Sequence, residues 1–133
     1  MLSREDLESY LIRMDVEHEE IAEGMYLVRG GEEGLPLVLD HSPPLLVLRL
    51  KVMDLPSSDP ELTHLYRSLL EWNANELVHG AYGIEKNEVV LLDTLQLEAL
   101  DYGRLQASVE SLLMAAAGHM ERIRSLAPST AEG

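Results

Sequence analysis

The feature that most constrains the fold is the segment from Leu69 to Ile123, where a helix end, a β-hairpin and a long amphipathic helix follow one another with almost no loop. Two runs of strand-forming residues, Val78 to Ile84 and Val89 to Leu95, flank the polar tip Glu85 to Glu88, which is typical of a hairpin. Asp101 can cap the helix that follows. Its apolar stripe recurs at helical spacing and consists of Leu105, Val109, Leu112, Leu113, Ala116, Met120 and Ile123.

The first half of the chain predicts a helix and then three strands. Ser3 is an N-cap for an amphipathic helix that runs to about Met14. Glu19 to Arg29 has short-period patterning rich in Ile, Tyr and Val, so it predicts one strand, closed by a glycine-rich turn. Leu35 to Asp40 predicts the second strand, and Leu45 to Met53 the third.

The strand from Leu45 to Met53 separates two chemically different faces. One face is wholly apolar and carries Leu46, Leu48, Leu50 and Val52. The other face carries Val47, Arg49 and Lys51, so it is expected to be at least partly wet. After this strand, Asp59 and Pro60 begin a second amphipathic helix that ends near Asn73 or Asn75.

The order of these elements predicts an α+β fold of the form α-β-β-β-α-β-β-α. Short links favour antiparallel pairing, so we expect an antiparallel five-stranded sheet with the helices packed on one face. A length of 133 residues suits one domain, assigned to residues 1–127. Residues 128–133 are expected to form a flexible C-terminal tail, because Pro128 ends the helical pattern.

Charge and composition exclude several classes of partner. The formal net charge is −14, from 24 acidic and 10 basic residues, so the field of the protein repels nucleic acid and anionic lipid. No apolar run approaches the roughly 20 residues of a membrane span, and the first residues lack a signal-peptide pattern. Cysteine is absent, which excludes disulfides and thiolate chemistry. A cytoplasmic protein is expected.

The sequence offers no constellation that supports catalysis, a metal or a cofactor. The histidines are scattered along the predicted elements without ligand spacing. Glu61 and His64 have a spacing found in di-iron bundles, but the second motif and the further glutamates of such a site are missing. Acidic residues around His18 indicate a solvated strand entry, because acid and base catalysis needs carboxylates in two different environments. We therefore predict a non-enzymatic protein that needs no cofactor.

With these elements, the chain resembles the YbjN-type family, described as bacterial sensory transduction regulators, and the type III secretion chaperones of the CesT class. The resemblance covers nearly the whole chain and rests on Leu69, Leu70, Asn73, Ala74, Gly80, Ala81, Gly83, Ile84, Leu92, Leu95, Leu100 and Asp101. It implies an α+β fold, commonly a homodimer, in which the secretion branch holds partly unfolded effector segments against apolar patches. The implied role is that of a protein-binding regulator or chaperone.

Four residues are candidates for contact with a protein partner. Arg49 and Lys51 are unusual cations in so acidic a chain, and with Val47 they could flank a groove for a client segment. They could equally be solvent-facing strand residues. Trp72, the only tryptophan, could anchor a dimer interface or pack at the end of its helix. A small-molecule sensor with its ligand between sheet and helices is the alternative from another class.

Overall fold

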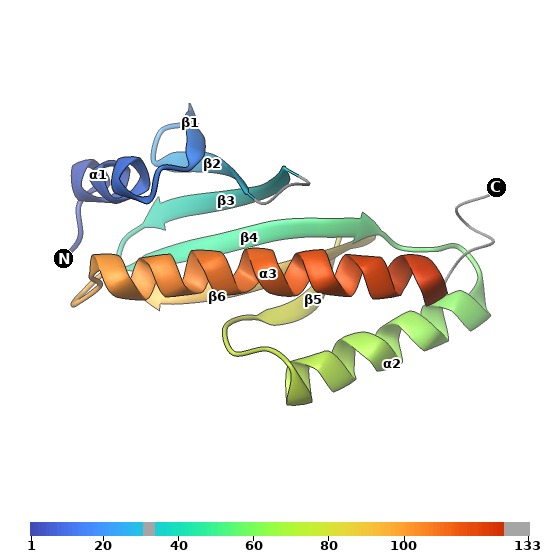
Figure 1. Ribbon diagram of the computed structural model, residues 1–133. Coiled ribbons are helices and arrows are strands. Elements are labelled where there is room, and N and C mark those ends of the chain that lie inside the picture. The colour runs from blue at the N-terminus through green and yellow to red at the C-terminus, as the bar shows by residue number, and fades with distance from the viewer. Residues whose placement is uncertain (31–33, 127–133) are drawn as a thin grey trace.

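The protein is an antiparallel sheet covered on one side by helices (Figure 1). The computed structural model describes residues 1–30 and 34–126, and within them it has six strands and three helices. The elements are α1 (Arg4–Met14), β1 (Glu17–Ala22), β2 (Met25–Gly30), β3 (Leu35–Ser42), β4 (Leu45–Asp54), α2 (Asp59–Asn75), β5 (Ala81–Glu85), β6 (Glu88–Gln96) and α3 (Tyr102–Leu126). The α+β class and the antiparallel pairing expected from the sequence are thereby confirmed.

The strands lie in the order β1-β2-β3-β4-β6-β5, and every neighbouring pair is antiparallel. Of the strands that the structure describes, β4 and β5 are consecutive in sequence but are not neighbours in the sheet, because β6 lies between them. Helix α2 connects β4 to the outer strand β5. The hairpin β5–β6 then returns the chain to β4, where Arg49 is paired with Leu92. The sheet therefore has β1 at one edge and β5 at the other.

The hydrophobic core lies between the sheet and the helices. Helix α3 runs along one face of the sheet and contacts β3, β4 and β6, as Figure 1 shows. Helix α2 lies beside the β5 edge and also touches α3. Alternate residues of β4 point into this layer, which explains the apolar face that the sequence predicted. The side chains with no exposed surface include Leu7, Leu37, Leu39, Leu46, Leu48, Leu50, Leu91, Leu105 and Leu112.

The prediction of five strands is wrong, because the sheet has six. The segment predicted as one strand, Glu19 to Arg29, contains a turn, and its two arms pair as β1 and β2 with Glu17 opposite Arg29. Gly24 makes this turn possible, since its φ of +76° lies in the left-handed region that favours glycine. The order of elements is accordingly α-β-β-β-β-α-β-β-α.

The remaining elements lie where the sequence placed them, with shifted ends. The fourth predicted strand begins at Ala81 instead of Val78. Helix α2 ends at Asn75, one of the two predicted positions, and is capped by Glu76. The side chain of Asn73 bonds to the backbone of Tyr82 on β5. The expected flexible tail, residues 128–133, lies outside the described residues.

Candidate protein-binding surfaces

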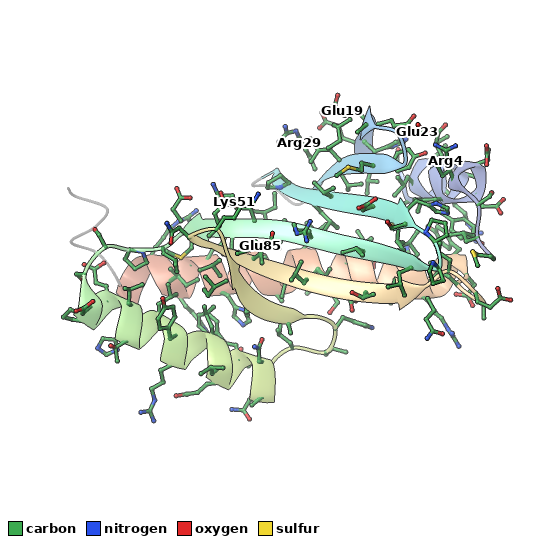
Figure 2. The ribbon with its side chains drawn as sticks, turned by 180° about the vertical axis from the view of Figure 1, so that it is seen from behind. Arg4, Glu19, Glu23, Arg29, Lys51 and Glu85 are labelled. Atoms are coloured by element: carbon green, nitrogen blue, oxygen red, sulfur yellow. The ribbon has the colours of Figure 1, made fainter. Side chains whose placement is uncertain are left out.

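Among the described residues, the helices leave one face of the sheet uncovered, and Figure 2, turned by 180° from Figure 1, shows this face toward the viewer. Val47, Arg49 and Lys51 alternate with the buried leucines of β4, so all three side chains belong to this open face. The strand register places half-buried apolar side chains beside Arg49: Val38 on β3 is its direct partner on one side and Leu92 on β6 on the other. The open face is thus a mixed band of apolar and charged side chains.

Arg49 and Lys51 on the open face are each paired with acids of the same chain. Nε of Arg49 lies 3.2 Å from a carboxylate oxygen of Glu85, which belongs to the tip of the β5–β6 hairpin. Nζ of Lys51 lies 3.0 Å from Glu88 and 3.1 Å from Asp54. The hydrogen bond to Glu88 raises the pKa of the Lys51 ammonium group, and the bond to Asp54 adds to this effect. An acidic group of a client could replace Glu85, Glu88 or Asp54 as the partner of these cations. The replacement would cost little free energy, because ion pairs at an exposed surface contribute little stability.

Trp72 lies on the other side of the molecule from the three β4 residues. Its side chain is only 7% exposed and faces the core, where it stacks on His119 of α3. The structure therefore brings Val47, Arg49 and Lys51 together on one surface and separates Trp72 from them.

A second candidate surface lies where α2 meets β5. Leu70 is 68% exposed and Ile84 is 47% exposed, and Tyr66 is also exposed. These three side chains share a cavity of about 400 Å³ whose remaining lining is Leu69, Asn73, Tyr82 and Gly83. Exposed apolar side chains that gather on one patch are typical of an interface with another protein.

The sequence held a signal for this surface. Helix α2 has five apolar positions at helical spacing, Leu62, Leu65, Tyr66, Leu69 and Leu70, together with Trp72. The core needs only Leu65, Leu69 and Trp72, which are the buried residues of the helix. The apolar stripe is therefore wider than the core requires, and its excess width, at Tyr66 and Leu70, forms the patch.

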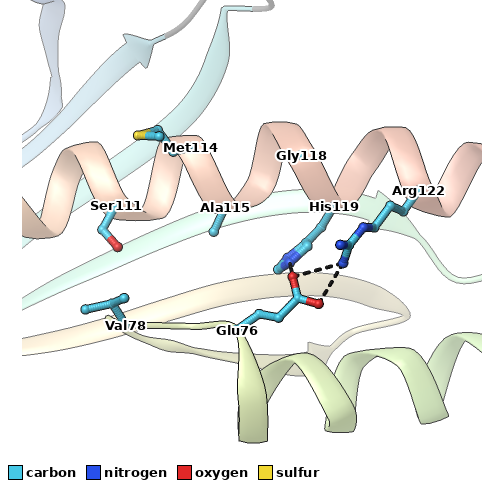
Figure 3. Close-up of a pocket in the computed structure, with 8 residues that line it drawn as sticks. All are labelled: Glu76, Val78, Ser111, Met114, Ala115, Gly118, His119 and Arg122. Carbon is cyan, nitrogen blue, oxygen red and sulfur yellow. Dashed lines mark hydrogen bonds and ion pairs between the residues drawn. The ribbon is translucent and has the colours of Figure 1, made fainter.

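A third candidate surface is a hollow between α3 and the segment that joins α2 to β5, and Figure 3 shows its lining. Its volume is about 570 Å³. The exposed side chains of Val78 and Met114 border it, and Ala115 and Gly118 on α3 provide small lining residues. At one end a carboxylate oxygen of Glu76 bonds both His119 and Arg122. Sequence reasoning missed this polar end, because nothing local connects Glu76 to α3.

Two features are absent from the described ranges, 1–30 and 34–126. No three His, Asp or Glu side chains gather there as a metal site would require. In the same ranges, no helix combines the length and the apolar character needed to cross a membrane.

Within the described residues, three helices and an open antiparallel sheet of six strands match the folds of type III secretion chaperones. A family model, CesT_Tir_1, matches residues 2–129, so the chain belongs to this family of type III secretion chaperones. The resemblance noted from the sequence is thereby confirmed. No curated protein matches the chain at a significant level.

Solved structures show the same fold at low sequence identity. The complex of the Yersinia pestis type III secretion chaperone SycH with a fragment of YscM2 contains a chain 19% identical, with a TM-score of 0.60 over 84% of this chain and 94% of that one. The heterodimeric ExoU–SpcU complex of Pseudomonas aeruginosa contains a chain 15% identical, with a TM-score of 0.63 over 89% of this chain and 94% of that one. YbjN of E. coli, described as a transcription regulator, is 11% identical, with a TM-score of 0.62 over 96% of this chain and 92% of that one.

Proposed function

We propose that the protein is a non-enzymatic chaperone or regulator that binds a segment of a client protein in the bacterial cytoplasm. The observation that carries the proposal is the sheet face without helices, whose apolar band is interrupted by cations in a chain of net charge −14. Membership of a secretion chaperone family supports a protein as the partner. The complex of SycH with a fragment of YscM2 and the heterodimeric ExoU–SpcU complex, which have the same fold, support it as well.

The client segment is assigned to the open face around Val47, Arg49 and Lys51. Apolar neighbours such as Val38 and Leu92 would supply most of the affinity, while the cations orient acidic groups of the client. The test is recovery of a partner by affinity purification, its identification, and rebinding of the purified partner to wild type and to the Arg49→Glu/Lys51→Glu variant.

The matched control reverses two exposed charges away from this face, Arg67→Glu on α2 and Arg104→Glu on α3. We expect the variant of the open face to lose binding and the control to keep it, with unchanged thermal unfolding of both. Equal binding by wild type and by the variant of the open face contradicts the assignment.

We also propose that the protein forms a symmetric homodimer through α2 and the β5–β6 hairpin. The exposed patch of Tyr66, Leu70 and Ile84 supports this surface, since a two-fold axis would place two such patches against each other. Trp72 would contribute indirectly, by fixing α2 on the core, so Trp72→Ala changes folding as well as any interface.

The clean test of the dimer is Leu70→Glu, because this side chain is 68% exposed in the single chain. Ile12→Glu on α1 is the matched control, since Ile12 is 63% exposed and lies at the other end of the molecule. Light scattering at micromolar concentration should show a dimer for wild type and for the control, and a monomer for Leu70→Glu. A wild-type monomer sinks the proposal.

The alternative, a sensor with its ligand between sheet and helices, gains no support from the core. The space between the sheet and α3 is filled by side chains without exposed surface, among them Leu48, Leu91 and Leu112. The hollows described above lie at the surface, where they border exposed side chains. This arrangement favours an extended partner over an enclosed ligand.

A further inference from the structure

Three elements meet at the buried histidine of α3. The ring of His119 stacks on Trp72 of α2, with ring centroids 4.1 Å apart and planes 6° from parallel. The hydroxyl of Tyr82 on β5 lies 2.6 Å from Nδ1 of His119. Glu76, the C-cap residue of α2, places a carboxylate oxygen 3.3 Å from Nε2. Only 5% of His119 is exposed, and its contact with Tyr82 is buried, whereas the side chain of Glu76 is 40% exposed and borders the surface hollow.

The two partners of the ring determine its protonation state. A carboxylate only accepts hydrogen bonds, so Nε2 must carry the hydrogen that faces Glu76. Nδ1 then keeps its lone pair and accepts the hydrogen of the Tyr82 hydroxyl. Burial raises the pKa of Tyr82, so this hydroxyl remains a donor. Every hydrogen bond of the cluster is satisfied when the histidine is neutral.

A second proton on His119 would break this arrangement. It would sit on Nδ1 and point at the Tyr82 oxygen, so the hydroxyl hydrogen of Tyr82 would have to turn away from its acceptor in a buried place. Glu76 offers limited compensation, because Nη1 of Arg122 already lies 2.8 Å and 2.9 Å from its two oxygens. Burial lowers the pKa of His119, and the bond to Glu76 opposes that effect only in part.

The cluster joins the C-terminal end of α2 and strand β5 to α3. Asn73 accepts a hydrogen bond from the backbone N–H of Tyr82 at 2.8 Å and donates to its carbonyl oxygen, so the end of α2 and β5 form one unit. This unit meets α3 at the His119 cluster. A change in the protonation of His119 therefore affects the packing of both α2 and β5 against α3.

We propose that Tyr82, His119 and Glu76 form a proton-sensitive latch that holds the C-terminal end of α2 and strand β5 against α3, and that acidification loosens this side of the protein. In an unfolded or opened chain, His119 titrates near its ordinary pKa of about 6.5. Between that value and the lower pKa of the closed latch, the open form binds the additional proton. The full stability of the closed form is present above pH 6.5 and decreases as the pH falls below that value. The equilibrium constant for opening, the ratio of open to closed form, rises by up to about tenfold per pH unit.

Trp72 reports on the latch directly, because it is the only tryptophan and stacks on the ring that titrates. Its fluorescence, followed from pH 8 to pH 4.5 in the folded protein, should change with a midpoint below about 6.5. Tyr82→Phe removes the hydrogen bond that Nδ1 of the neutral ring accepts, so the midpoint should rise, while burial of the ring keeps it below the ordinary histidine value. A wild-type midpoint at or above 6.5, or the same midpoint in Tyr82→Phe, overturns the proposal. A purely structural role for Tyr82 would not move this midpoint.

Urea unfolding at pH 7.5 and 5.5 supplies the second readout, at one fixed protein concentration. Carboxylates also respond to pH, so the comparison is with His119→Gln, which cannot gain the proton, and with the matched control His64→Gln on the exposed face of α2. Wild type and His64→Gln should lose stability on acidification by up to about tenfold more in the unfolding constant than His119→Gln. Equal losses in all three proteins contradict the latch.

Hydrogen exchange separates local opening from general acid sensitivity. Amides of β5 and of the end of α2 should lose protection at pH 5.5, beyond the change in chemical exchange rate, while those of β3 and β4 keep theirs. A uniform loss across the sheet overturns the local latch. Because these readouts concern the single chain, they remain valid if the proposed homodimer fails; if α2 and β5 do form the dimer, its dissociation should follow the same midpoint.

Discussion

Gly80, which joins α2 to β5, should not tolerate even one additional methyl group. Its φ of +75° lies in the left-handed region, where an L side chain costs about 1–2 kcal/mol. A Cβ atom added there would lie 2.6 Å from the carbonyl oxygen of Leu92 and 2.8 Å from Cδ2 of Leu112. The leucine methyl can move, but the carbonyl belongs to β6, whose backbone is paired with β4 and β5.

Overpacking of this kind costs about 1–3 kcal/mol, so Gly80→Ala should lower the free energy of unfolding by about 2–5 kcal/mol in total. Gly83→Ala is the matched control, because Gly83 lies in β5, the strand that follows Gly80, has no positive φ and has nothing within 4 Å of an added Cβ. It should leave stability unchanged or raise it by up to about 1 kcal/mol. Urea unfolding followed by circular dichroism, at equal protein concentrations, measures both. A loss below about 1 kcal/mol in Gly80→Ala, or similar losses in both variants, refutes this reasoning.

Three further substitutions test the packing and the caps in the same unfolding assay. Gly118→Ala should raise stability by about 0.5–1 kcal/mol, because this helical residue has open space around an added Cβ; a loss would show that the hollow beside α3 is occupied. Ser3→Ala should cost about 1 kcal/mol, since Ser3 and Asp6 form a reciprocal capping box at the start of α1, and an unchanged midpoint would contradict that role. Leu48→Ala, at a fully buried position of the central strand, should cost about 2–5 kcal/mol, and less than 1 kcal/mol would mean that the core closes over the gap.

The sequence predicted those elements whose two faces differ strongly. Strand β4 alternates leucines with polar or smaller residues, and its predicted faces are the ones the structure has. The turn between β1 and β2 was missed because β1 is exposed along almost its whole length, so no alternation of apolar residues marks it as a separate strand. An edge strand with little buried surface leaves little pattern in a sequence.

Some residues of the candidate surfaces could be placed from local sequence patterns, and others could not. Placement of Val47, Arg49 and Lys51 on one face followed from the period of a strand, which is a local property. The burial of Trp72 did not follow, because the width of the apolar stripe on α2 left open which part of it faces the core. The patch of Tyr66, Leu70 and Ile84 required the same information, together with the position of β5.

By itself, the sequence determined the class of fold, the β5–β6 hairpin and the inward and outward faces of the central strand. Those properties follow from periodicity, capping and turn chemistry within short segments. Only the tertiary structure decided that Trp72, Glu76, Tyr82 and His119 meet in one cluster. Their contacts depend on how α2, β5 and α3 pack, and packing is set by the combined shape of many side chains that are distant in the sequence. A histidine that is one of five in the sequence thereby becomes the buried centre of three elements.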